Sequence, residues 1–236
     1  MNTVIARYRF HAAVIAVLAG AVFIGFARTY YFSVFFDNPP LPQAAHLHGI
    51  LATVWIALHY TQARLVAAHR LDIHRRLGIF GACVAALLAV QVVSMAIANA
   101  AAGHGGPPGR DPLQFLSVPL GTTTMFALFV GSALVLRRKR EWHKRLMLLA
   151  SLSLLVPAMG RIDLQIVAPL GLPRLVLAPA VTFAFLAWAC VHDWRQLGRV
   201  HPAYIVGGLA LLVSIPLRRW IGFTDAWLPI ARWLVA

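Results

Sequence analysis

Residues 77–100 read LGIFGACVAALLAVQVVSMAIANA, a long run without a single charged side chain. A helix needs about 20 apolar residues to cross the hydrocarbon of a bilayer. Only helices and closed barrels satisfy the backbone inside lipid, and the strands of a barrel would alternate apolar and polar residues. Because this run is continuously apolar, it predicts a membrane-spanning helix.

The rest of the chain has the same character. Of its 236 residues 60% are hydrophobic and 12% are charged, whereas soluble domains carry about 25% charged residues. We therefore predict an all-α membrane protein that forms a single helical membrane domain over residues 1–236, with about seven transmembrane helices. The predicted spans are residues 10–27, 46–66, 77–100, 115–136, 146–160, 175–191 and 203–217. The Trp-rich tail that follows predicts an interfacial C-terminal helix.

The basic residues predict the orientation. Most of the 21 Lys and Arg residues lie in the N-terminus and in the alternate loops 64–76, 137–145 and 192–202. Loops rich in Lys and Arg stay on the cytoplasmic side, so we predict a bacterial inner-membrane protein with a cytoplasmic N-terminus. Arg218 and Arg219 run against this rule. The net charge is +14, and the basic residues that produce it lie between apolar runs. This placement indicates contact with the bilayer and its anionic headgroups and not with nucleic acid.

A short motif occurs twice. His74-Arg75-Arg76-Leu77 precedes the third span, and His143-Lys144-Arg145-Leu146 precedes the fifth. The spacing equals one helical hairpin, so the second and third spans are predicted to repeat in parallel as the fourth and fifth. Such a repeat has a pseudo-twofold axis along the membrane normal, which predicts a central four-helix bundle built from these spans.

The ten histidines are unusual in so apolar a chain. At 100° per residue, His48, Trp55, His59 and Gln62 share one face of the second span, and polar groups inside a membrane face the bundle interior. The third span presents a face of small residues. If these faces meet, they form an inner cluster of His59, Gln62, His74 and His143. They also form an outer cluster of His46, His48, Asn99, Arg161 and Asp163.

One interpretation of the histidines is redox chemistry. Imidazoles on neighbouring membrane helices are the usual axial ligands of a b-type haem. This interpretation makes His59, His74 and His143 the inner cofactor ligands and His48 the outer one, with a redox partner that the sequence does not name. A bound metal ion is the related possibility, with His46, His48 and His59 as its ligands.

Two other interpretations stay open. Helix starts that carry Arg75, Arg76, Lys144 and Arg145 present free N–H groups and cations to an anion, which predicts binding of anionic lipid headgroups or another anion. His74 and His143 can also be simply solvated at the starts of their helices, with the Arg residues setting the topology. A small-molecule transporter is the third candidate. A proton-coupled transporter usually carries a buried carboxylate, and none of the seven acids lies clearly inside a span, which weakens this interpretation. Whether the protein is an enzyme stays open, although GxSxG, HExxH and Walker A motifs are absent from the sequence.

The motifs between about residues 46 and 163 resemble a group of bacterial multi-pass membrane proteins catalogued as a domain of unknown function (2306). These motifs are the His-x-His-Gly at residues 46–49, the two repeated His-basic-Arg-Leu segments and Arg161. The resemblance implies an inner-membrane helical bundle. More distantly, the bundle resembles cytochrome b561-type proteins, which hold two haems between four helices. The fourth span here has no histidine, so a single haem between His59 and His74 or His143 is the expectation.

Overall fold

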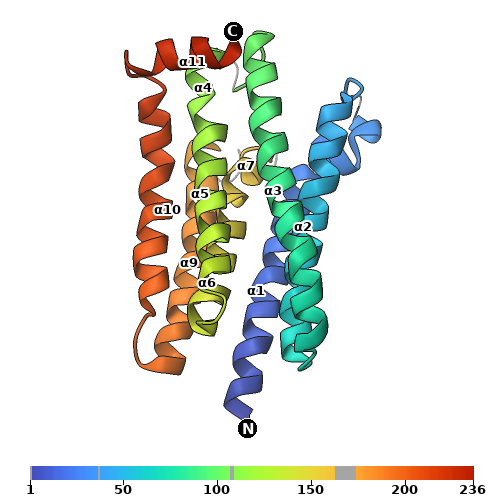
Figure 1. Cartoon of the computed structure of the whole chain (residues 1–236). Coiled ribbons are helices and arrows are strands. Elements are labelled where there is room, and N and C mark those ends of the chain that lie inside the picture. Colours follow the sequence, from blue (N-terminus) through green and yellow to red (C-terminus); the bar gives the residue numbers. More distant parts are fainter. Residues whose placement is uncertain (1, 37, 107–108, 163–173) are drawn as a thin grey trace.

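The computed structural model describes residues 2–36, 38–106, 109–162 and 174–236, and each regular element in these ranges is a helix (Figure 1). The first half contains one helix followed by a long hairpin. Its elements are α1 (Asn2–Phe26), the π-helical turn η1 (Ala27–Tyr31), the 3₁₀ turn η2 (Ser33–Phe36), α2 (Gln43–Ala67) and α3 (Leu71–Ala101).

The second half adds a second hairpin and then two more long helices. Its elements are α4 (Pro112–Phe115), α5 (Ser117–Val135), α6 (Arg140–Ser153), α7 (Leu155–Met159), α9 (Arg174–Leu197), α10 (Pro202–Ile221) and α11 (Trp227–Val235). The helices α3 and α5 pack side by side and join the two hairpins, while α10 packs against both α5 and α6. The predicted four-helix centre is therefore extended by α10 and by α1, which packs against α2 and α7 (Figure 1).

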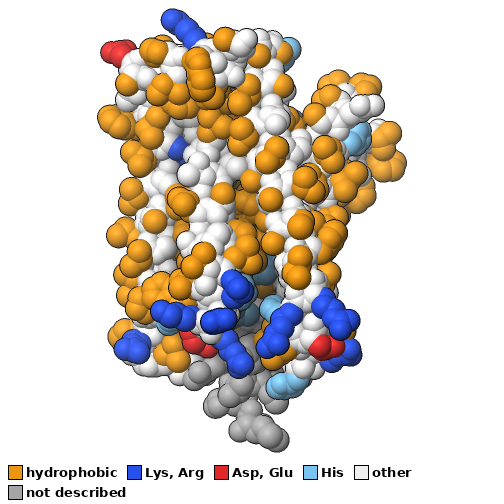
Figure 2. Space-filling model, viewed as in Figure 1, with side chains coloured by type: hydrophobic (Ala, Val, Ile, Leu, Met, Phe, Trp, Pro, Cys, Tyr) orange, Lys and Arg blue, Asp and Glu red, His pale blue; other side chains and the backbone are white. Residues whose placement is uncertain are grey.

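Five helical segments of the described chain are long and apolar enough to cross a membrane. They are Phe10–Tyr31, Leu71–Ala101, Pro112–Val135, Leu177–Leu197 and Pro202–Ile221. Their outward surfaces are covered by hydrophobic side chains (Figure 2). The chain is a multi-pass membrane protein.

The other two predicted spans differ from these five for separate reasons. The helix α2 has 25 residues, which is long enough, but its polar stripe lowers its hydropathy. The predicted fifth span is divided between α6, with 14 residues, and α7, with five. Almost every residue from Arg145 to Met159 is buried by neighbouring helices. Because this segment contacts protein and not lipid, it can be short and can carry the fully buried Ser151 and Ser153.

The turn between α2 and α3 depends on a histidine in an uncommon backbone conformation. His69 has a φ of 58°, which is the left-handed region that glycine usually occupies after a helix. The amide of Arg70 donates to the Leu65 carbonyl at 2.9 Å, the long backbone bond typical of a Schellman ending. The role of His69 in this structure is therefore to end α2.

Lys and Arg side chains gather at the end of the molecule that holds the turns at residues 68–70, 136–139 and 198–201 (Figure 2). We call this the basic end. At the opposite end, the nine-residue α11 lies across the tips of the long helices (Figure 1), and we call this the α11 end. Nine residues are too few to cross a bilayer, in agreement with the predicted interfacial helix. The cytoplasmic location of the basic end stays a prediction.

Candidate functional site

Two histidines from the repeated motif meet at the basic end. His74 is the fourth residue of α3 and His143 is the fourth residue of α6, and their ring centroids lie 6.4 Å apart with planes at 88°. The residues that precede the two helices, Arg70 and Lys139, have nearly the same backbone angles, with φ near −90° in both. The two hairpins thus present equivalent imidazoles to one another, as the predicted parallel repeat requires.

One hydrogen bond orients the ring of His143, and another fixes the backbone of His74. The Nδ1 atom of His143 lies 2.8 Å from the carbonyl oxygen of Ala133, which can only accept, so Nδ1 carries the proton. This tautomer leaves Nε2 with a free lone pair unless the ring is charged. The side-chain amide of Gln62 donates to the His74 carbonyl at 3.1 Å. The Nδ1 atom of His74 is buried and has no hydrogen-bond partner.

His59 lies deeper in the bundle and connects α2 to α6. Its Nδ1 atom lies 2.7 Å from the hydroxyl of Ser151, which also accepts a hydrogen bond from the Trp55 indole at 3.2 Å. All three side chains are buried, and His59 and His143 are close enough to interact electrostatically. The polar face of the second span is therefore turned inward, and the four predicted members of the inner cluster are brought together.

The outer cluster is only partly assembled. The Nδ1 atom of His48 lies 3.0 Å from the Gln91 side-chain oxygen, and Arg161 lies within electrostatic range of His48. His46 is exposed and its ring faces Tyr30 at 6.0 Å. Asn99 is exposed, and Asp163 lies outside the described residues.

The three histidines predicted as metal ligands are not brought together. His46, His48 and His59 all lie on the continuous helix α2, and the 11 residues from His48 to His59 correspond to about 16 Å of rise. These two side chains cannot bind the same ion. Across the part of the chain that the structure describes, no group of three or more His, Cys, Asp or Glu side chains is arranged to hold a metal ion.

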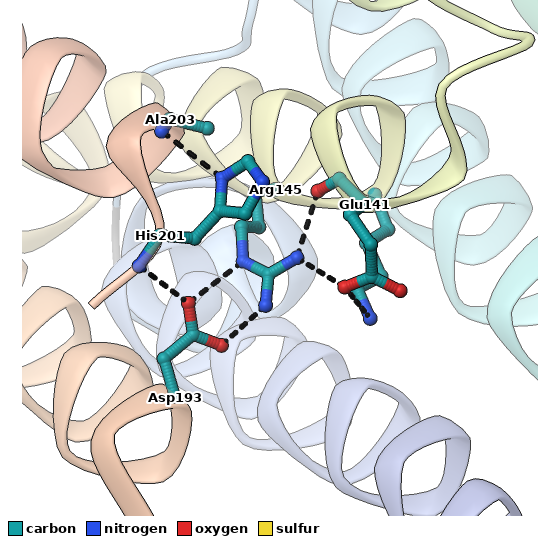
Figure 3. Close-up of polar contacts among 6 residues, drawn as sticks. Glu141, Arg145, Asp193, His201 and Ala203 are labelled. Atoms are coloured by element: carbon teal, nitrogen blue, oxygen red, sulfur yellow. Dashed lines mark hydrogen bonds and ion pairs between the residues drawn. The ribbon is translucent and has the colours of Figure 1, made fainter. Parts of the chain in front are cut away.

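The four predicted anion-binding residues have different surroundings. Arg75 and Arg76 are exposed at the start of α3. Arg145 is 2% exposed and is held by protein carboxylates (Figure 3). Its Nε and Nη2 atoms donate to the two carboxylate oxygens of Asp193 at 2.8 and 2.5 Å, and Nη1 donates to Glu141. This leaves Arg75 and Arg76 as the members of the set that face solvent or headgroups.

The ion network around Arg145 connects three helices at the basic end. Glu141 lies on α6 and also pairs with Lys144 at 2.7 Å, while Asp193 on α9 accepts from the backbone amide of His201 at the start of α10. Burial would raise the pKa of the Glu141 carboxyl, but its bonds to Arg145 and Lys144 lower the pKa to about 2. Burial and the nearby Arg145 lower the pKa of His201, which keeps its Nδ1 atom available to cap α10 by accepting from the Ala203 amide (Figure 3).

Sequence reasoning missed Ser151, Gln91 and the role of Asp193. Asp193 lies 48 residues from Arg145, and Ser151 lies 92 residues from His59. The local sequence pattern therefore predicts neither contact. One signal was present, because Asp193 is one of only seven acids in the chain. Its place near the end of an apolar run could have suggested a pair with a basic residue of the repeated motif.

No protein-family model matches the chain, and neither the curated proteins nor the solved structures contain a match. The class of this protein therefore rests on its own helices, which define a multi-pass membrane protein. Its resemblance to the uncharacterised bacterial family and to cytochrome b561-type bundles stays a prediction.

Proposed function

We propose that this membrane protein binds one b-type haem, which His74 and His143 would hold, and that the haem would supply one-electron transfer. The observation that carries the proposal is the separation of the two rings. Two imidazoles that would hold one metal between them, each at a metal–nitrogen distance of about 2.0 Å, would have ring centroids on the order of 6 Å apart. The centroids of His74 and His143 are separated by 6.4 Å.

The surroundings of the two rings are compatible with ligation. A ligating imidazole commonly donates its other ring N–H to a backbone carbonyl, which fixes the tautomer and the ring orientation. His143 has this partner in Ala133. The buried Nδ1 atom of His74, which has no hydrogen-bond partner, is the kind of polar atom that a ligand satisfies.

Small residues on α3 are compatible with a flat ligand beside His74. Gly78 and Gly81 lie one and two turns after His74, on the same side of the helix. A Cβ atom added at Gly81 would meet no atom within 4 Å, and one added at Gly78 would meet only the Gln62 amide at 3.4 Å. The residues present thus fit a group that two imidazoles would hold better than a metal ion that three side chains would hold.

A bound haem would supply one-electron chemistry at this end of the bundle. The contribution of the chain would be to hold the imidazoles of His74 and His143. His59 stays an alternative ligand, because it lies within electrostatic range of His143.

Binding of anionic headgroups is the second candidate function. Arg75 and Arg76 are exposed in the first turns of α3, where the helix dipole and the free N–H groups also favour an anion. This function needs no cofactor and predicts a colourless protein.

An optical spectrum separates these functions. The protein would be purified in detergent from cells supplied with a haem precursor, and spectra would be recorded in the oxidised and dithionite-reduced states with iron analysis on the same sample. We expect about one haem per chain in the wild type and loss of most of it in His74→Ala and His143→Ala. His104→Ala, in an exposed loop at the other end, is the matched control and should keep the full spectrum. A colourless wild type, or a His74→Ala variant with an unchanged spectrum, contradicts the proposal.

A further inference from the structure

Arg218 is a buried cation that has no counter-charge among the residues that the structure describes. Its side chain lies on α10 and is 3% exposed, and its Nε, Nη1 and Nη2 atoms are buried without a hydrogen-bond partner. The guanidinium group keeps its charge at any ordinary pH, and a buried, unpaired charge is strongly destabilising. Such a group is retained when something else satisfies it.

The contrast with Arg145 is informative. These two are the buried arginines among the described side chains, and Arg145 is paired with Asp193 and Glu141. The ion pairs found among the described residues involve Asp72, Glu141 and Asp193, and none of them includes Arg218. None of the described acids therefore lies within ion-pair distance of Arg218.

The surroundings of Arg218 leave room for its side chain and add further positive charge. Gly121 on α5 faces its aliphatic part, and a Cβ atom at Gly121 would lie 2.9 Å from the Arg218 Cβ. Arg219 is adjacent and interacts electrostatically with Arg110, which lies over the Phe223 ring at 5.1 Å. The nearest acid along the chain to Arg110 is Asp111, which accepts from the Leu113 amide and caps α4.

The depth of Arg218 indicates the type of anion. It lies three residues before the end of α10 at Ile221, which corresponds to about 4.5 Å of helix rise. This is the α11 end, where Trp220 and Trp233 are 65% and 76% exposed and where aromatic side chains mark the headgroup region. Phosphate groups of lipids lie at that depth, and the planar fork of Arg matches two phosphate oxygens.

We propose that Arg218 is the anchor of a phosphate-binding site between α5 and α10, with Arg219 and Arg110 as the outer cations. The ligand is the phosphate group of an anionic phospholipid or inorganic phosphate. This site is at the opposite end from His74 and His143 and does not depend on a haem.

The test measures the unfolding midpoint of the detergent-purified protein with three additives: phosphatidylglycerol, phosphatidylcholine, and inorganic phosphate against chloride at equal ionic strength. Native mass spectrometry counts the retained lipid. We expect phosphatidylglycerol or phosphate to raise the wild-type midpoint with at least tenfold greater apparent affinity than phosphatidylcholine. A response to inorganic phosphate that also displaces lipid identifies a free anion, and a response to lipid alone identifies the headgroup.

Arg218→Leu should lose this response while its midpoint without additive stays equal to or above that of the wild type, because an unpaired buried charge has been removed. Arg232→Leu is the matched control, since Arg232 is an exposed arginine at the same end, and it should respond within twofold of the wild type. If Arg218→Leu does not fold, Arg218→Lys replaces it and should bind about tenfold more weakly, because a point charge lacks the fork. A wild type that responds to no phosphate compound, or an Arg218 variant that responds like the wild type, overturns the proposal.

Discussion

At the residue scale, the structure separates two kinds of charged contact at the basic end. Arg145 and Asp193 are both 2% exposed and share two hydrogen bonds. Arg70 and Asp72 pair at 3.5 Å with 58% and 65% of their side chains exposed. Solvent screens the exposed pair, whereas removal of one partner from the buried pair leaves the other charge in an apolar environment.

Arg145→Gln should therefore lower the free energy of unfolding by about 3–5 kcal/mol, and Arg70→Gln by about 0–1 kcal/mol. Denaturant unfolding in detergent measures both changes. Adding Asp193→Asn to Arg145→Gln should recover part of the loss, because no unpaired carboxylate remains. Equal effects of the two single substitutions would show that the Arg145 network does not stabilise the fold.

The pH dependence of stability follows from Glu141. Its folded-state pKa of about 2 is below the ordinary value of 4.5, so its contribution is fully present above pH 4.5 and is lost as the pH falls toward 2. The difference in unfolding midpoint between the wild type and Glu141→Gln should be constant from pH 7 to 5 and should shrink below pH 4.5. A difference that shrinks already near pH 6 would assign the effect to another group.

At the element scale, a glycine sets the distance between two helices. Gly25 on α1 is buried, and a Cβ atom there would collide with the backbone carbonyl of Ala158 on α7. Small residues allow membrane helices to approach this closely. The short α7 can thus pack against α1 although it has only five residues.

Gly25→Ala should destabilise the protein by about 1–3 kcal/mol, because backbone atoms must move to make room. Gly20→Ala on the same helix is the matched control. A Cβ atom there meets nothing within 4 Å, so the better helix propensity of Ala should leave stability unchanged or raise it by up to about 1 kcal/mol. The measurement is the unfolding midpoint of each variant in the same detergent, compared with the wild type. A Gly25→Ala variant with an unchanged midpoint would argue against the close α1–α7 contact.

At the scale of the whole molecule, the turn at residues 136–139 and the loop around His104 lie at opposite ends, separated by the apolar segment Pro112–Val135. The basic residues predict that the turn is cytoplasmic. In a background with Cys83 and Cys190 replaced by Ala, a membrane-impermeant thiol reagent should label His104→Cys in intact cells and Arg138→Cys only after lysis. The reverse pattern would invert the orientation, and labelling of both from one side would mean that this segment does not cross.

The sequence by itself determined that the chain is a helical membrane protein, because long apolar runs have no other stable form in lipid. It also indicated the inward polar face of α2 that carries His59 and Gln62, because helix periodicity fixes which residues share a face. Only the tertiary structure decided that the fifth predicted span is divided and buried, that Arg145 binds Asp193, and that no described residue pairs with Arg218. Each of these depends on contacts between helices distant in sequence, and local periodicity does not specify which neighbour a face meets.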